Sequence, residues 1–312
     1  MDFVVVDVET ANPDLSSICQ VGIASFRGGT LAEAWESLVN PEDYFSPFNI
    51  SIHGVDENRV RDAPKWEEIF PQVVFRLQEM IVVSHTPFDR AALERACWRS
   101  NLAECECKWL DSARVARVAW PEFACYGYSL PRVAARLGID YRAHDALEDA
   151  RCAGLLVVKA IEITGLSPEQ WLTRVRHPIH SAGHVDHSTG PYPEHVKRGG
   201  NPNGRLFGEV VVFTGSLSFS RDSAAEAASA AGCCVDDGVT KHTTMLVVGD
   251  RDILRFGSEK STKQRKAEKL INSGQHIRIL GESDFKRIID CGDNRAPAAE
   301  AVPVEPRPNR TT

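Results

Sequence analysis

Near the start of the chain stands the stretch Val4-Val5-Val6-Asp7-Val8-Glu9-Thr10. Its three consecutive valines predict a strand that is buried on both faces, because β-branched side chains suit a covered sheet. Side chains alternate along a strand, so Asp7 and Glu9 point to the face that Phe3 and Val5 share. Two carboxylates this close repel each other unless a divalent cation lies between them, which predicts a metal site. The alternative is an exposed strand end whose acids face water.

The composition is that of an ordinary globular protein. A chain of 312 residues exceeds the usual size of one domain, so we expect two. Hydrophobic residues make up 43% and charged residues 25%, which is typical. No apolar run approaches the roughly 18 residues that span a bilayer, and the N-terminal sequence lacks the basic flank of a signal peptide. We therefore expect a cytoplasmic protein.

The net charge of −7 is unevenly distributed. Residues 1–165 contain 16 basic and 25 acidic side chains, whereas residues 206–290 contain 12 of each. If the acidic first region handles a polyanion, it must do so through bound metal ions and local basic groups. A broad positive surface is excluded there.

A hairpin and further elements are expected after the first strand. Alternation over residues 20–26 and the turn at 27–30 predict the hairpin, with a third strand at about 34–39. Residues 49–55 are expected to form a polar loop, which precedes a helix at about 65–78.

A helix is expected to begin directly after an apolar, buried strand at residues 81–85. Thr86 is predicted as its N-cap, Pro87 as its first residue, and Asp89 falls in its first turn. Asp89 could simply cap the backbone and meet the positive end of the helix dipole. It also follows the end of a buried strand, where open α/β sheets place their ligand crevices, so it could join Asp7 and Glu9.

A fourth acid accompanies a histidine. The capping-box spacing of Asp145 and Glu148 starts a helix that continues as an apolar-periodic run to Ile163. His144 then lies in the loop before the helix, and Asp149 lies one turn into it. The arrangement would combine a movable base with a fixed ligand. The alternatives are a solvated histidine and an acid that merely complements the helix dipole.

Residues 166–205 are rich in proline and glycine and are expected to form a linker. This stretch holds half of the ten histidines. Nothing in it suggests a rigid framework that would orient imidazole rings, so only adventitious metal binding is expected. The histidines whose spacing could bind a transition metal in this way are His177, His180, His184 and His187. The tail at residues 293–312, rich in alanine, proline and glutamate, is expected to be disordered.

Residues 206–292 predict a compact second α/β domain. The expected order is strand, helix, strand, strand, helix, strand and helix. These elements are expected at residues 209–215, 221–231, 233–236, 244–248, 262–272, 277–280 and 283–289.

Residues 1–165 resemble the DEDDh family of 3′-to-5′ exonucleases. The resemblance rests on Asp7-x-Glu9-Thr10, on Phe88-Asp89, and on His144 with Asp149, in the order of the family and at roughly its separations. Residues 52–55 also look like the segment with which the family lines the terminal nucleotide. Three residues separate His85 from Asp89 where the family commonly has four, which puts His85 in doubt but not Asp89.

The resemblance implies a ribonuclease H-like α/β domain, with a mixed central sheet and flanking helices, that hydrolyses phosphodiesters with two divalent cations, Mg²⁺ or Mn²⁺. It implies that Asp7, Glu9 and Asp149 hold one cation. Asp7 would bridge to the second cation, which Asp89 would support through water. His144 would take the proton from the attacking water near neutral pH. The residues implied to bind the substrate are Thr10, His53, Gly54 and Phe88.

Residues 206–290 resemble a BRCT domain through Phe213-Thr214-Gly215, Ala231-Gly232 and residues 245–249. The final helix carries Phe285 where many such domains carry tryptophan, and Ala231 replaces one of the paired glycines. The resemblance implies binding of DNA, of a phosphate group such as a 5′ phosphate, or of replication or repair proteins. The residues on its phosphate-binding positions are Thr214, Gly215, Arg221 and Lys263.

The expected substrate is a single-stranded 3′ end of DNA, because a terminal nucleotide must be splayed onto apolar side chains. A 3′-to-5′ exoribonuclease is the nearest alternative, since the same residues serve RNA and none announces a contact to the 2′-hydroxyl. A non-catalytic module that tethers DNA or a partner is the third possibility. An inactive copy, however, has no need to keep costly clustered charges.

Overall fold

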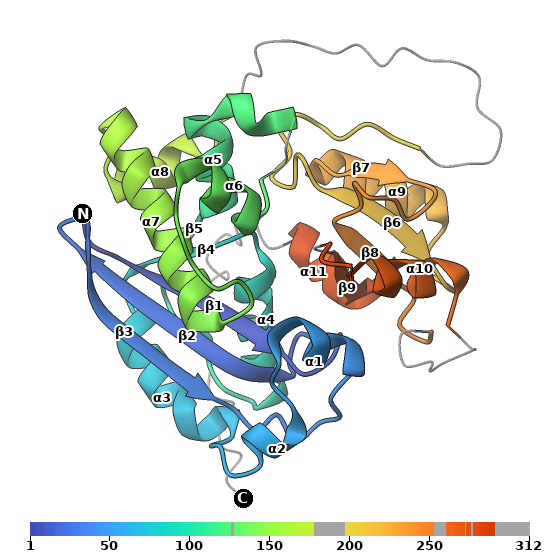
Figure 1. The fold of residues 1–312 in the computed structure, drawn as a ribbon, viewed down its shortest axis with the longest axis horizontal. Helices are drawn as coiled ribbons and strands as arrows, with labels where there is room; N and C mark the ends of the chain where they lie inside the picture. The colour runs from blue at the N-terminus through green and yellow to red at the C-terminus, as the bar shows by residue number, and fades with distance from the viewer. Residues whose placement is uncertain (126–127, 178–196, 253–259, 272, 276, 291–312) are drawn as a thin grey trace, which may run out of the picture.

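The computed structural model describes six ranges of the chain, which the figures show in colour (Figure 1). Within them the chain builds two α/β parts, each on its own sheet. We call them the first layer, the described residues up to 177, and the second layer, the described residues from 197 to 290. The described residues are 1–125, 128–177, 197–252, 260–271, 273–275 and 277–290.

The first sheet is mixed and has five strands in the order β3-β2-β1-β4-β5. β1 (Phe3–Thr10) lies at its centre, antiparallel to β2 (Ile18–Arg27) and parallel to β4 (Ile81–Ser84). β3 (Thr30–Leu38) and β5 (Lys108–Asp111) form the edges. The hairpin, the central buried strand and the strand at 81–85 were expected from the sequence, whereas β5 was not.

Helices cover both faces of this sheet (Figure 1). α7 (Ala146–Thr164) packs along β1 and β2, on the face of Phe3. α3 (Trp66–Leu77) and α4 (Phe88–Arg99) pack on the opposite face, against Val4 and its neighbours. None of the described helices is long and apolar enough to cross a membrane. The remaining helices of this part are α1 (Pro47–His53), α2 (Glu57–Val60), α5 (Ser112–Ala119), a 3₁₀ helix (Pro121–Cys125), α6 (Leu130–Leu137) and α8 (Pro168–Arg174).

Two local expectations were wrong. Residues 49–55, expected to be a loop, lie largely in α1, which starts with a proline in its first turn and ends at Gly54 in the left-handed region, φ 73°. Both are helix-boundary signals that outweigh the polar side chains between them. Thr86 does not cap α4, whose N-cap is Pro87. The backbone of Thr86 has φ 75° instead, a strained conformation for a β-branched residue.

The second sheet is parallel and has four strands in the order β7-β6-β8-β9. Each of its elements lies within a few residues of the position expected from the sequence. The elements are β6 (Val210–Thr214), α9 (Arg221–Ala231), β7 (Cys234–Asp236), β8 (Met245–Val248), α10 (Thr262–Ile271), β9 (Arg278–Gly281) and α11 (Glu282–Asp290). α9 connects β6 to β7 and α10 connects β8 to β9, because neighbouring parallel strands need crossover connections.

The stretch expected to be a linker is partly folded. Its first residues form α8, which opens with a capping box between Ser167 and Gln170 and buries Trp171 completely. At its other end, the N–H of Asn201 donates to the carbonyl of Ser229 at 2.9 Å. The burial of one large aromatic side chain is what ties α8 to the first core. The expectations for His180, His184 and His187 and for the tail at 293–312 lie outside the described residues.

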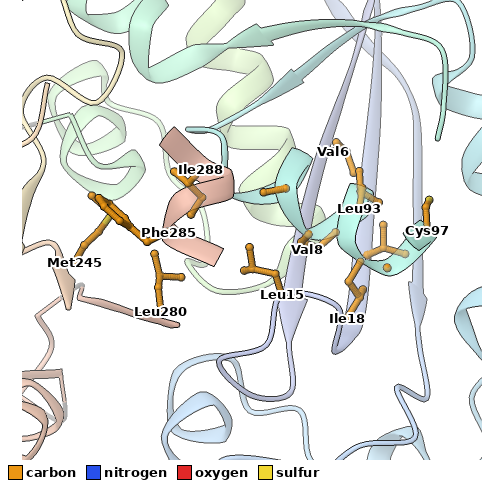
Figure 2. Packing of buried hydrophobic residues seen from close by; sticks show 14 of the residues in the cluster. Val6, Val8, Leu15, Ile18, Leu93, Cys97, Met245, Leu280, Phe285 and Ile288 are labelled. Carbon is orange, nitrogen blue, oxygen red and sulfur yellow. The ribbon is translucent and has the colours of Figure 1, made fainter. Parts of the chain in front are cut away.

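The two layers share one apolar cluster (Figure 2). Leu15 lies between Val8 and Ile18 of the first layer and Leu280 and Phe285 of the second (Figure 2). Such burial of aliphatic and aromatic side chains is the main favourable contribution to association.

Polar contacts accompany this cluster on α11. The N–H of Leu15 donates to Oδ2 of Asp284 at 3.3 Å, and Arg95 of α4 lies 3.6 Å from the other carboxylate oxygen. Arg117 lies 3.9 Å from Glu209 at a second point between the layers. The second layer is therefore anchored next to the end of β1 that carries the acids.

Candidate active site

Four carboxylates converge on one cleft of about 410 Å³. Asp7 and Glu9 come from the end of β1, on the face that α7 covers. Asp89 comes from the first turn of α4, and Asp149 from the first turn of α7. The structure therefore brings together the four acids that the sequence singled out, from three separate elements.

Asp89 faces the strand end and is not merely a helix cap. Its side chain is 1% exposed, and its Oδ1 accepts the N–H of Val8 in β1 at 3.2 Å. Its Oδ2 is buried without a hydrogen-bond partner among the described residues. A buried carboxylate oxygen without a partner is costly, and a cation would relieve that cost.

His144 is held against Asp149 by its backbone. The N–H of His144 donates to Oδ2 of Asp149 at 2.7 Å, and His144 adopts φ 64°, in the left-handed region. Donor atoms of Glu9, His144 and Asp149 lie within 4.8 Å of one another. The loop histidine and the helix acid thus form a compact group with one acid of β1.

Burial in the cleft is the largest cause that raises the pKa of all four carboxyl groups. The pKa values of Asp7 and Glu9 lie well above their ordinary range, and those of Asp89 and Asp149 rise to about 7. The neighbouring carboxylates raise these pKa values further, and the guanidinium of Arg278 lowers them. The cluster is therefore electrostatically unfavourable in its charged form when no cation is bound.

The residues present fit divalent cations. The cleft offers hard oxygen donors from several elements, together with one imidazole, which is the donor chemistry of Mg²⁺ or Mn²⁺ sites. Glu9, His144 and Asp149 form one potential group of ligands, and Asp7 and Asp89 line the same cleft. From the sequence we expected Asp7, rather than His144, to hold a cation together with Glu9 and Asp149.

The expected substrate-binding residues differ in their positions. His53 and Phe88 line the cleft. The Nδ1 of His53 accepts the N–H of Val55 at 3.0 Å, so its Nε2 carries the proton and donates to the carbonyl of Thr10 at 3.1 Å. Burial lowers the pKa of His53 to about 4, which keeps the ring neutral. Thr10 and Gly54 are not among the residues that line the cleft. The carbonyl of Thr10 accepts from Asn49 and so holds α1 against β1, whereas the exposed Gly54 caps the end of α1.

His85 has a structural role in the wall of the cleft. Its two ring nitrogens lie 2.9 Å from Oγ of Ser112 and 2.9 Å from the carbonyl of Tyr128. Burial lowers its pKa to about 3, so the ring is neutral. The next residue, Thr86, is fixed by a hydrogen bond from its N–H to Asp111 at 3.2 Å.

Sequence reasoning missed a charged residue of the cleft that comes from the second layer. Arg278, at the start of β9, lines the cleft beside the four acids, and NH1 of its guanidinium donates to Oγ1 of Thr86 at 2.6 Å. No local sequence signal predicts this, because a single arginine at a strand start is ordinary. Other residues that the second layer adds to the wall are Glu209, Thr244, Ile271, Gly274, Gln275, Ile277 and Ile279.

The residues expected to bind phosphate in the second layer gather at the end of β6. Nζ of Lys263 donates to the carbonyl of Phe213 at 3.0 Å, and Arg221 donates to the same carbonyl at 3.2 Å and to that of Gly215 at 3.0 Å. Oγ1 of Thr214 donates to Ser261 at 2.9 Å. Two cationic groups and a hydroxyl thus lie around one loop.

Residues 4–156 match the protein family described as "Exonuclease" (RNase T). The chain is similar to a DNA polymerase III PolC-type of Thermotoga maritima, with 26% identity over 165 residues, which cover 52% of this chain and 12% of the relative. It is similar to a 3′-5′ exonuclease DinG of Staphylococcus aureus, with 26% identity over 164 residues, 51% of this chain and 18% of the relative. The chain thus covers only a small part of these curated relatives.

Among solved structures, the chain is similar to Exonuclease X in complex with 5′ overhanging duplex DNA. The identity is 22%, the match covers 55% of this chain and 97% of the other, and the TM-score is 0.46.

The first layer and the family that its residues match define a class of enzyme, the phosphodiester hydrolases. Within this class, residues 4–156 form a 3′-to-5′ exonuclease domain of the DEDDh type.

Proposed function

We propose that this protein removes nucleotides from single-stranded 3′ ends of DNA with two divalent cations, Mg²⁺ or Mn²⁺. The observation that carries this proposal is the convergence of Asp7, Glu9, Asp89 and Asp149 on one cleft beside His144. A cluster of carboxylates that repel one another is costly to keep, and it has a use where cations and a phosphodiester meet.

The cations, when bound, lower the pKa of water and stabilise the leaving 3′ oxygen. Asp7, Glu9 and Asp149 would hold one of them, with Asp7 shared by the second. The unpartnered Oδ2 of Asp89 would support the second cation, directly or through water. His144 would accept the proton of the attacking water, since an imidazole with an ordinary pKa of about 6.5 is poised for this near neutral pH.

A splayed, single-stranded end suits the walls of the cleft. Phe48, Ile52 and Phe88 offer apolar surfaces on which bases can stack, and each stacked base contributes about 1 to 3 kcal/mol of binding. The cleft of about 410 Å³ lies within the usual volume range of small-ligand pockets, which suits an end of the strand better than a duplex. The name of one relative, a DNA polymerase, and the BRCT-like second layer favour DNA. Replication or repair is the setting that we propose.

An exoribonuclease is the second candidate, because the same donor set serves RNA. The test uses DNA and RNA oligonucleotides of one sequence, labelled at the 5′ end, with Mg²⁺ or Mn²⁺. We expect a ladder that shortens by single nucleotides from the 3′ end and forms faster on DNA. Faster degradation of RNA would favour the second candidate. If neither the DNA nor the RNA is degraded, the remaining possibility is a non-catalytic module that tethers DNA or a partner.

For residues 206–292 we propose a BRCT domain that captures a phosphate group, most simply the 5′ phosphate of DNA. The support is the group formed by Thr214, Arg221 and Lys263 at the end of β6. The segment from Arg255 to Lys269 also carries six basic residues against two acids. Such a domain would deliver the nuclease to nicked or broken strands.

Binding of duplexes with and without a 5′ phosphate, at fixed salt, tests this second proposal. We expect wild type to prefer the phosphorylated duplex, and Lys263→Ala to lose that preference. Lys241→Ala, which removes an exposed lysine of the same layer, is the matched control. If wild type and Lys263→Ala bind both duplexes equally, the second layer binds proteins instead of phosphate.

A further inference from the structure

Arg278 enters the cleft from the second layer and is held there by two contacts. Its NH1 donates to Oγ1 of Thr86 at 2.6 Å, and its guanidinium carbon lies 4.9 Å from the centre of the Phe88 ring. A guanidinium over an aromatic face is favourable. Thr86 lies in the turn between β4 and α4, and Phe88 is the first residue of α4, next to Asp89.

The charge of Arg278 is available to a ligand. Among the described residues it forms no ion pair with a carboxylate, although it lies near enough to the four acids to lower the pKa of each. Two divalent cations balance the four carboxylates. The other charged residues described in the cleft are Arg278, Arg132 and Glu209, so the loaded cleft keeps one net positive charge. One phosphodiester carries the complementary charge.

The position of Arg278 is set by the docking of the second layer. α11 directly follows β9 and is fixed by the contact of Leu15 with Asp284 and by the apolar cluster around Phe285. β9 and α11 are therefore not free to move away from the cleft without breaking this cluster. Ile277 and Ile279, the neighbours of Arg278 in the chain, line the same cleft.

We propose that Arg278 is a substrate-binding residue that the second layer supplies to the exonuclease cleft, where its guanidinium binds a backbone phosphate of the single strand. This inference rests on the proposed nuclease function. The planar guanidinium has more donors than Thr86 uses, and these donors match the oxygens of a phosphate. The second layer then acts as part of the active site, in addition to any ligand that it binds at β6.

The test measures binding of a fluorescent single-stranded DNA to the full chain, with Ca²⁺ in the cleft, at several salt concentrations. We expect Arg278→Ala to weaken binding by about 10- to 100-fold, as for a lost hydrogen bond to a charged group. The slope of log affinity against log salt should fall by about 0.7, which corresponds to one phosphate contact on a single strand. Arg278→Lys should keep the slope and recover only part of the affinity.

Two further variants separate this role from a general effect of charge or folding. Arg198→Ala removes an exposed arginine of the second layer outside the cleft and should leave affinity and slope unchanged. Thr86→Val removes the hydroxyl that accepts from Arg278 and should weaken binding by less than Arg278→Ala. Unchanged affinity and slope in Arg278→Ala would overturn the proposal, as would absence of binding by wild type.

Hydrolysis in Mn²⁺ gives an independent outcome. Faster hydrolysis by Arg278→Ala than by wild type would also overturn the proposal, because Arg278 would then occupy the place of the substrate. If wild type binds the strand but does not hydrolyse it, the proposed nuclease function fails, while the salt slopes still decide whether Arg278 contacts phosphate.

Discussion

Replacement of Asp89 by asparagine should stabilise the metal-free protein at alkaline pH. Asparagine has nearly the same shape, and its Oδ1 can still accept the N–H of Val8. The carboxylate whose charge it removes is 1% exposed and lies near Asp7 and Asp149. Arg278 and the N–H groups of Val8 and Asp89 offset this charge in part. The expected gain therefore comes from removing a buried negative charge.

The size and sign of this change in the free energy of unfolding follow from the pKa of Asp89, which burial raises from 3.8 to about 7. Between these values the folded protein binds more protons than the unfolded chain, so its stability falls as the pH rises and the loss is complete above about pH 7. At about 1.36 kcal/mol per pKa unit the loss is on the order of 4 kcal/mol. Because the neighbouring acids share protons, we expect a gain of about 1 to 4 kcal/mol for Asp89→Asn at pH 8, and none near pH 4.

The assay is thermal unfolding of wild type and variant in EDTA from pH 4 to 8. A gain of this size raises the Tm by about 2 to 4 °C per kcal/mol. Saturating Mn²⁺ should reverse the order, since the cation binds the folded wild type more tightly. Asp56→Asn is the control: Asp56 is the N-cap of α2 and its pKa is lowered, chiefly by the N–H of Arg59, so its neutralisation should not stabilise the protein. A Tm difference for Asp89→Asn that does not change with pH would refute the reasoning.

Two further predictions concern His144 and the start of α7. His144→Ala should lower the rate of hydrolysis by about 10² to 10⁴-fold and remove the acidic limb of the pH-rate profile, while binding of a single strand persists. An unchanged profile would exclude a role as base. Gly22→Ala should cost about 1 to 3 kcal/mol of stability and slow hydrolysis, because its Cβ would lie 2.3 Å from backbone atoms of Ala146 and Leu147 and displace the helix that carries Asp149. Gly199→Ala, with open space around its Cβ, is the control in thermal unfolding, and equal Tm values for the two variants would contradict the steric argument.

The acids of the cleft could be predicted because local rules place them. Alternation along β1 puts Asp7 and Glu9 on one face, and the ends of adjacent strands and the starts of helices meet at one edge of a sheet. The same rules located each element of the second sheet. They failed at residues 49–55, where the helix-boundary residues Pro47 and Gly54 mattered more than the polar residues between them.

The place of Arg278 could not be predicted for a different reason. Its approach to the cleft depends on the docking of α11, in which Leu15 meets Asp284, a contact 269 residues apart in the chain. No periodicity or turn signal carries information about such a contact. The strained backbone of Thr86, which holds the acceptor for Arg278, is likewise set by tertiary contacts and not by local preference.

The most direct test of the central claim is the release of a labelled 3′-terminal nucleotide from single-stranded DNA, in Mn²⁺, by wild type and by Asp7→Ala. Asp7 belongs to a cluster of repelling charges, so its removal should leave the fold intact and should not lower the Tm in EDTA. The account predicts rapid release by wild type, no release in EDTA, and no release by Asp7→Ala at the same concentration. Release by folded Asp7→Ala at the wild-type rate would contradict the assignment of this cleft as the site of hydrolysis.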